Sequence, residues 1–225
     1  ENIGSGAVTA SFSECRNADA IIVIGANPAV NHPVAATFIK NAAQRGAKLY
    51  VMDPRGQHLD RYATHSVNFR PGSDVALLNA MINVIITEDL FDTDYVRDHT
   101  EGFADLKART AASTPEAMSP LCGIEPDVIR DVARGYAGAN AAMIFWGMGI
   151  SQHTHGTDNS RCLISLALLT GNVGKAGSGL HPLRGQNSVQ GASDAGLIPM
   201  FFPDYKPVSD DETRAKYEAL WGTNL

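Results

Sequence analysis

One short run of this sequence combines a cation, side-chain amides and glycines, a mixture that suits a binding site better than a packed core. Residues 183–191 read LRGQNSVQG. The guanidinium of Arg184 offers a rigid fork of donors that matches a carboxylate. The amide of Gln186 can donate and accept at the edge of a heterocycle, and Gly185 lets backbone approach a ligand closely. The run predicts a site for a small polar anion, with a solvated turn as the alternative.

Polar and glycine residues also follow three predicted strands. These strand tips cover residues 25–29, 52–55 and 147–152. Ligands of open α/β sheets bind outside the carboxyl ends of the strands, so we expect a nucleotide there. Asp53 suits a ribose hydroxyl pair or the N1/N2 edge of guanine, since a carboxylate accepts two hydrogen bonds side by side. Arg55 suits a phosphate, and Gly72 and Asp74 would complete the base pocket. An Asp-Pro turn is the plainer interpretation of Asp53.

These tips must be positioned by alternating strands and helices. Short apolar runs rich in β-branched residues predict strands buried on both faces, at 19–25, 47–53, 65–69 and 141–146. Proline starts, glycine stops and apolar periodicity predict helices at 33–45, 75–88, 93–99, 102–112, 126–136 and 157–170. Asp74 is the expected N-cap of the second of these helices. The alternation predicts an α/β fold with a doubly wound, mostly parallel sheet and helices on both faces.

The sequence changes character after this region. We expect residues 1–183 to form the α/β domain, and residues 184–225 an active-site loop and the truncated start of a neighbouring domain. Residues 199–205 are predicted to be irregular, and residues 210–221 to form an amphipathic helix. The first six residues carry no Met, basic region or apolar segment, which indicates an internal piece of a longer protein.

Composition excludes several classes of function. A net charge of −6 without a Lys/Arg-rich tract argues against nucleic acid. No apolar run reaches the roughly 18 residues that a membrane helix needs. Cys15, Cys122 and Cys162 are scattered, which gives neither a disulfide framework nor a C-x-x-C metal site and favours a reducing cytoplasm. The seven histidines form no H-x-x-x-H pattern, so no metal ligand is expected in this segment. No G-x-S-x-G supplies a hydrolase nucleophile.

With these motifs, the chain resembles the catalytic alpha subunit of molybdenum or tungsten formate dehydrogenases, in the bis-molybdopterin guanine dinucleotide oxidoreductase family. The matching stretches are residues 23–28 with the pair 32–33, then 46–55, 74–80, 146–152, 169–175 and 184–191. The resemblance implies the dinucleotide-binding domain of that family, a bis-molybdopterin guanine dinucleotide cofactor with molybdenum or tungsten, and the oxidation of formate to carbon dioxide.

The resemblance also implies roles for particular residues. Arg184 would orient formate, where related nitrate reductases carry Thr, and Gln186 would touch the pterin. The guanine dinucleotide pocket would fall on Asn27, Asp53, Arg55, Gly72, Asp74, Met148, Gly149 and Gln152. The metal-ligating Cys or selenocysteine, the iron–sulfur cysteines and a pterin-binding Lys would lie upstream, and a second cofactor domain downstream. The segment alone is therefore expected to be inactive and to need the remaining domains of its subunit, with iron–sulfur and flavin electron-transfer subunits that pass electrons commonly to NAD.

Three alternatives remain open. One is another molybdopterin oxidoreductase. A second is a non-catalytic subunit of the same fold, as in respiratory complex I, against which the retained Asp53, Gln152, Arg184 and Gln186 argue. The third is a plain NAD-binding dehydrogenase domain, which the single glycine of the first tip disfavours, since that domain carries G-x-G-x-x-G.

Overall fold

The structure is a computed structural model that describes residue 3 and residues 7–225. Most of the N-terminal run that we interpreted as an internal start, residues 1, 2 and 4–6, lies outside the described residues. The chain divides into two compact units, residues 1–183 and 184–225.

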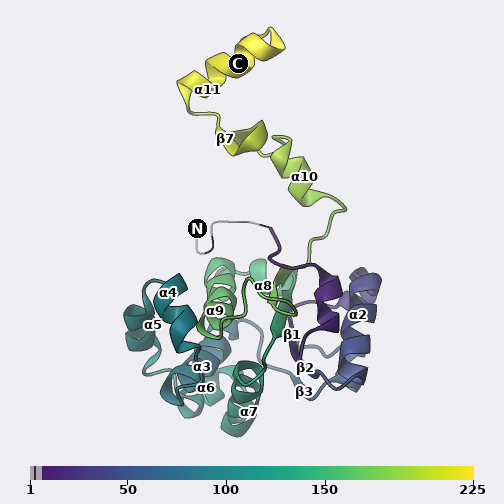
Figure 1. The fold of residues 1–225 in the computed structure, drawn as a ribbon, viewed down its shortest axis with the longest axis vertical. Coiled ribbons are helices and arrows are strands. Elements are labelled where there is room, and N and C mark those ends of the chain that lie inside the picture. Colours follow the sequence, from purple (N-terminus) through teal and green to yellow (C-terminus); the bar gives the residue numbers. More distant parts are fainter. Residues whose placement is uncertain (1–2, 4–6) are drawn as a thin grey trace. The chain divides into compact units, whose positions relative to one another are not determined.

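The first unit is built around a five-stranded parallel sheet (Figure 1). Its strands are β1 (Ala20–Ile24), β2 (Lys48–Met52), β3 (His65–Val67), β4 (Ala142–Trp146) and β5 (Gly179–Pro182). Their order is β3-β2-β1-β4-β5, and every neighbouring pair is parallel. The chain winds outward from β1 in one direction to β3 and then in the other through β4 to β5. The predicted doubly wound α/β fold is confirmed.

Helices cover both faces of this sheet (Figure 1). Alternate residues of β1 show the division, because Ile21 and Val23 pack on one core cluster while Ile22 and Ile24 pack on the other. The first face is covered by η1 (Phe12–Arg16), α2 (Pro33–Gln44) and η2 (His58–Tyr62). The second face is covered by α3 (Asp74–Thr87), α7 (Pro126–Ala137) and α9 (Gly156–Leu169). Burial on both faces explains why the central strands β1 and β4 are apolar at every position.

Smaller helices complete the unit. They are α1 (Pro28–Asn31), α4 (Thr93–His99), α5 (Phe103–Thr110), α6 (Pro115–Cys122) and α8 (Met148–Ser151). Helix α6 was not expected from the sequence, because Pro120 lies inside it and proline usually marks a break. Thr114 caps it, since its side chain accepts a hydrogen bond from the backbone nitrogen of Ala117.

Three local predictions need correction. Asp74 is the first residue of α3, and the N-cap is Ser73. The third strand ends at Val67, two residues before the expected end. Strand β5 is absent from the predicted strands, because its pairing with β4 is a long-range contact that no local pattern indicates.

The second unit contains α10 (Val189–Asp194), β6 (Phe201–Phe202), η3 (Pro203–Tyr205), β7 (Lys206–Pro207) and α11 (Asp211–Trp221). The predicted C-terminal helix is confirmed, and Asp210 caps it by accepting from the backbone nitrogen of Thr213 at 2.9 Å. The ring of Tyr217 packs against Phe202 and Trp221 at centroid distances of 4.8 and 4.9 Å. The expected irregular stretch 199–205 is partly ordered as β6 and η3.

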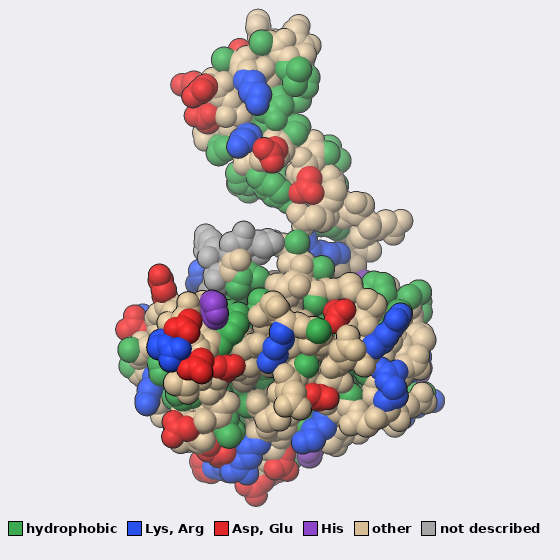
Figure 2. Space-filling model, in the orientation of Figure 1, with side chains coloured by type: hydrophobic (Ala, Val, Ile, Leu, Met, Phe, Trp, Pro, Cys, Tyr) green, Lys and Arg blue, Asp and Glu red, His purple; other side chains and the backbone are tan. Residues whose placement is uncertain are grey.

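Acidic and basic side chains lie intermingled over much of the helical surface of the first unit (Figure 2). On α4, for example, Arg97 contacts both Asp94 and Asp98. Such exposed pairs contribute little to stability, about 0–1 kcal/mol each. Among the described residues, no helix is both long and apolar enough to cross a membrane.

Candidate functional site

The carboxyl ends of β1 and β4 lie side by side where the winding of the sheet reverses. Two glycines, Gly25 and Gly149, allow their backbones to approach closely. The backbone nitrogen of Gly149 donates to the carbonyl oxygen of Gly25 at 3.0 Å. A Cβ on Gly149 would lie 2.6 Å from that oxygen, and Gly25 has a φ of +55°. A side chain at either position would therefore require the backbone to shift. In doubly wound sheets, ligands usually bind at this position.

Asn27 forms the tip of β1, as the N-cap of α1. Its backbone oxygen accepts from Val30 and Asn31. Its side-chain Oδ1 is buried and meets no donor in the described part of the protein. A buried acceptor without a donor costs free energy, so this oxygen is available to a ligand or water that can donate a hydrogen bond.

Asp53 forms the tip of β2 and is only 6% exposed. Its Oδ1 accepts from the backbone nitrogen of Arg55 at 2.9 Å, and its carbonyl oxygen accepts from the amide of Asn68 at 2.8 Å. The carboxylate is therefore held by its own turn, which leaves Oδ2 as the oxygen best placed to accept from a ligand. The Arg55 side chain is exposed.

The third tip is formed by α8, which follows β4. The predicted residues Met148, Gly149 and Gln152 are all exposed there. Asn159 of α9 anchors this short helix, since its buried amide donates to the carbonyl oxygen of Ile150 at 2.9 Å. The tip thus presents its side chains to solvent while its backbone is anchored in α9.

Asp74 lies at the start of α3 and is 3% exposed. Burial raises the pKa of its carboxyl group, while a hydrogen bond from its own backbone and the nearby His153 act in the opposite direction. Gly72, just before the helix, is exposed and has a φ of +81°, with no described atom within 4 Å of a Cβ built on it. The predicted base-pocket pair therefore combines one buried carboxyl and one open backbone turn.

The remaining two predicted residues belong to the second unit. Arg184 is half-buried and Gln186 is exposed. The neighbouring helix α10 is tied to η3, because the amide of Gln190 donates to the hydroxyl of Tyr205 at 3.0 Å. The fold thus brings eight of the predicted residues to the carboxyl ends of strands or the turns that follow them in the first unit, and keeps Arg184 and Gln186 in the second.

Sequence reasoning missed three polar residues of this edge. Asn68 holds the Asp53 turn, His153 approaches Asp74, and the amide of Gln57 donates to the carbonyl oxygen of Ala26 at 2.6 Å. Asn68 directly follows β3, but the predicted strand 65–69 contained it, so the strand-tip rule passed over it. Gln57 lies in a loop with no motif, and only its long-range contact reveals it.

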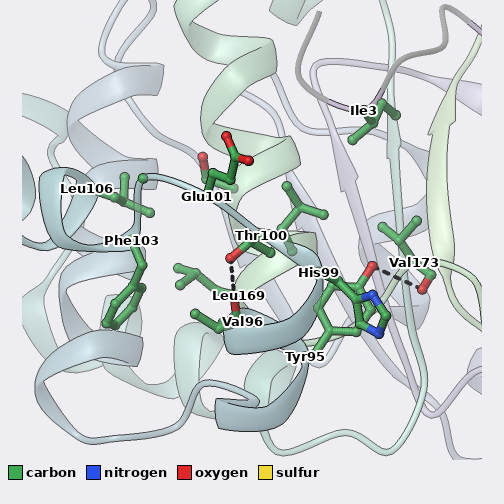
Figure 3. Close-up of a pocket in the computed structure, with 13 residues that line it drawn as sticks. Ile3, Tyr95, Val96, His99, Thr100, Glu101, Phe103, Leu106, Leu169 and Val173 are labelled. Carbon is green, nitrogen blue, oxygen red and sulfur yellow. Dashed lines mark hydrogen bonds between the residues drawn. The ribbon is translucent and has the colours of Figure 1, made fainter.

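A separate cavity of about 590 Å³ lies away from these residues, between the α4–α5 turn and α9 (Figure 3). Its wall mixes apolar side chains, such as Val96, Phe103 and Leu169, with the polar His99 and Glu101. The hydroxyl of Tyr95 there donates to the carbonyl oxygen of Val173 at 3.3 Å. None of the predicted site residues lines this cavity.

The cysteines of this chain are free. Burial raises the pKa of Cys15 to about 12 and that of Cys162 to about 11, so both are thiols at neutral pH. Cys162, expected to be a buried apolar residue, is half-buried and contacts the Oδ1 of Asn79. Within the described residues there is no group of three or more metal-binding side chains.

Comparisons with known proteins show the family of this chain. The profile of the molybdopterin oxidoreductase family matches residues 2–223. The chain is 43% identical to formate dehydrogenase H of Escherichia coli and 44% identical to the F420-dependent formate dehydrogenase subunit alpha of Methanocaldococcus jannaschii. Each match covers 99% of this chain but only 31% and 33% of the relative. The chain thus spans about a third of the length of these relatives.

A solved structure shares the fold. Acetylene hydratase from Pelobacter acetylenicus superposes with a TM-score of 0.70 over 76% of this chain and 23% of its own, at 29% identity. Its name describes a hydratase, so this fold is not tied to a single reaction.

Proposed function

Because the chain belongs to the molybdopterin oxidoreductase family, we propose that it is part of the catalytic subunit of a formate dehydrogenase, and that this part binds the guanine dinucleotide of the pterin cofactor. The observation that carries the proposal is the presence of Arg184 in a chain 43% identical to formate dehydrogenase H over 99% of its length. A fixed guanidinium fork suits formate, the smallest carboxylate.

The residues at the carboxyl edge of the sheet fit the dinucleotide. Asp53 and Asn27 carry acceptor oxygens that suit the N–H and O–H donors of guanine and ribose. The exposed Arg55 suits the pyrophosphate. Gly72, Asp74, Met148, Gly149 and Gln152 complete the pocket, and the glycines allow close approach of the backbone. Gln186 belongs on the pterin side.

The pterin centre, when bound, supplies molybdenum or tungsten as the acceptor of the two electrons that leave formate as it becomes carbon dioxide and a proton. Arg184 orients the formate carboxylate, and the first unit holds the far end of the cofactor. The remaining domains of the subunit and iron–sulfur and flavin subunits in the cytoplasm carry the electrons onward.

The proposal is tested on the full-length protein. We expect formate-dependent reduction of a dye, no reduction of nitrate, and the release of guanine nucleotide after acid hydrolysis of the purified protein. Asp53→Ala should lower the guanine content, whereas Asp131→Ala, at an exposed position of α7, should not. Another released nucleotide, such as NAD, would contradict the cofactor assignment, and turnover of a different substrate would contradict the formate assignment.

A further inference from the structure

One side chain outside the predicted site joins the first two strand tips. The Nε2 of Gln57 donates to the carbonyl oxygen of Ala26 at 2.6 Å, across 31 residues of sequence. Ala26 directly precedes Asn27, and Gln57 lies in the loop that follows Asp53 and Arg55. The bond therefore links the backbone on which Asn27 stands to the loop on which Asp53 stands.

Gln57 is itself held in place. Its backbone nitrogen donates to the Oδ2 of Asp60 at 2.6 Å, and the next residue but one, Leu59, is fully buried against the sheet. The link between the two tips is thus anchored at one end in η2 and at the other in the first turn after β1. A bond between two anchored segments fixes their separation.

Two side-chain oxygens beside this link are left to accept from a ligand. The Oε1 of Gln57 and the Oδ1 of Asn27 are both buried without a donor among the residues that the structure describes. Buried acceptors are normally paired, so both oxygens suit a donor that a bound ligand or water brings. The bond to Ala26 thus holds both oxygens at the same strand tip.

We propose that Gln57 is a positioning residue that holds Asn27 at a fixed distance from Asp53 and so preorganises the site for the nucleotide end of the cofactor. This inference rests on the proposed function. Gln57 acts through the Ala26 carbonyl group and not by contact with substrate. Its removal loosens the β1 tip without disturbing the sheet.

The test compares Gln57→Met with the matched control Gln44→Met, an exposed glutamine at the end of α2, in the full-length, cofactor-loaded protein. Gln57→Met should release guanine nucleotide roughly two- to tenfold faster, the factor expected for the loss of one ordinary hydrogen bond. The melting temperature of its cofactor-free form should fall by only a few degrees, because the Ala26 carbonyl oxygen loses its donor while the core of the sheet is kept. Gln44→Met should leave both the release rate and the melting temperature at the wild-type values.

Unchanged release overturns the inference. A cofactor-free form that loses its cooperative unfolding transition also overturns it, since Gln57 would then support the fold of the whole first unit. In a double-mutant cycle, adding Gln57→Met to Asn27→Ala should accelerate release little further, because both changes act on the same tip. If the effects of the two substitutions on the release rate are fully additive, Gln57 does not act through Asn27. If the wild-type protein holds no guanine nucleotide, the proposed cofactor fails as well, and the two failures are thereby distinguished.

Discussion

The polar side chains at the carboxyl edge of the sheet are held by backbone groups more than by one another. Asp53 accepts from the nitrogen of Arg55, Asn68 donates to the carbonyl of Asp53, and Gln57 donates to the carbonyl of Ala26. Backbone partners are fixed by the fold, so these side chains are oriented before any ligand arrives. Such preorganisation reduces the entropy lost on binding.

At the scale of single residues, the role that we propose for Arg184 predicts a large effect of Arg184→Lys. The ammonium group keeps the charge but loses the paired donors, so a charge-assisted hydrogen bond of about 1.5–3 kcal/mol is lost. We expect kcat/KM for formate in the full-length enzyme to fall about ten- to a hundredfold. Arg109→Lys, at an exposed position of α5, is the control. Equal kinetics for both variants would exclude Arg184 from orienting formate.

The raised pKa of Asp74 predicts a pH-dependent stability. A carboxyl group whose pKa is higher in the folded than in the unfolded protein stabilises the fold at low pH, and this contribution is lost as the pH rises through the folded pKa. Asp74→Asn mimics the neutral form. The cofactor-free variant should therefore melt at a higher temperature than the wild type at pH 7, and the difference should shrink toward pH 4. A variant that is less stable at every pH would show that the charged carboxylate is the form that the fold prefers.

At the scale of elements, the packing of α8 on the β1 tip depends on glycine. A Cβ on residue 149 would press into the carbonyl of Gly25 at 2.6 Å. Gly149→Ala should therefore destabilise the protein by about 1–3 kcal/mol, the range for overpacking. Urea unfolding would measure this.

Gly185→Ala serves as its control, since no described atom lies within 4 Å of the added carbon and no positive φ is recorded for Gly185. That substitution should change the stability by less than about 0.5 kcal/mol. Equal effects of the two substitutions would mean that α8 can move away from β1 at little cost.

The opposite end of β4 is held by a buried amide. The Oδ1 of Asn172 accepts from the backbone nitrogen of Ala142 and from the hydroxyl of Ser178, both at 2.9 Å, and its Nδ2 donates to Thr170 at 2.8 Å. These bonds tie the turn after α9 to the start of β4. They also place the chain for its entry into β5.

Asn172→Ala should leave several of these buried groups unpaired, at about 1–3 kcal/mol for each. The exposed Asn140→Ala, two residues before Ala142, should have little effect. Thermal unfolding of the two variants side by side is the measurement, and comparable melting temperatures would show that water replaces the amide.

At the scale of the whole molecule, the sheet, its covering helices and both core clusters belong to residues 1–183. A unit with its own core can fold alone. We expect a protein ending at residue 183 to unfold cooperatively in urea and to keep its near-ultraviolet circular dichroism. A broad, non-cooperative transition would mean that residues 184–225 are needed for the fold of the first unit.

Much of this fold could be predicted because its signals are local. Strands β1, β2 and β4 are runs of apolar residues buried on both faces, and α2, α3, α7 and α9 carry a periodicity and end signals of their own. The strand-tip rule then places Asn27, Asp53 and Met148 at one edge of the sheet. That rule needs only the order of elements along the chain, which the sequence supplies.

The features that only the tertiary structure decided depend on contacts between residues far apart in the sequence. Strand β5 exists because β4 lies beside it, and α6 forms in spite of an internal proline. Likewise, Gln57 reaches Ala26 across 31 residues, and Asn27 keeps a buried oxygen without a donor. The sequence by itself determined most of the elements, the doubly wound class of the sheet and the family resemblance, because periodicity and motifs are properties of neighbouring residues. Burial and hydrogen bonding of the site depend on which segments meet in space, so only the folded chain could decide them.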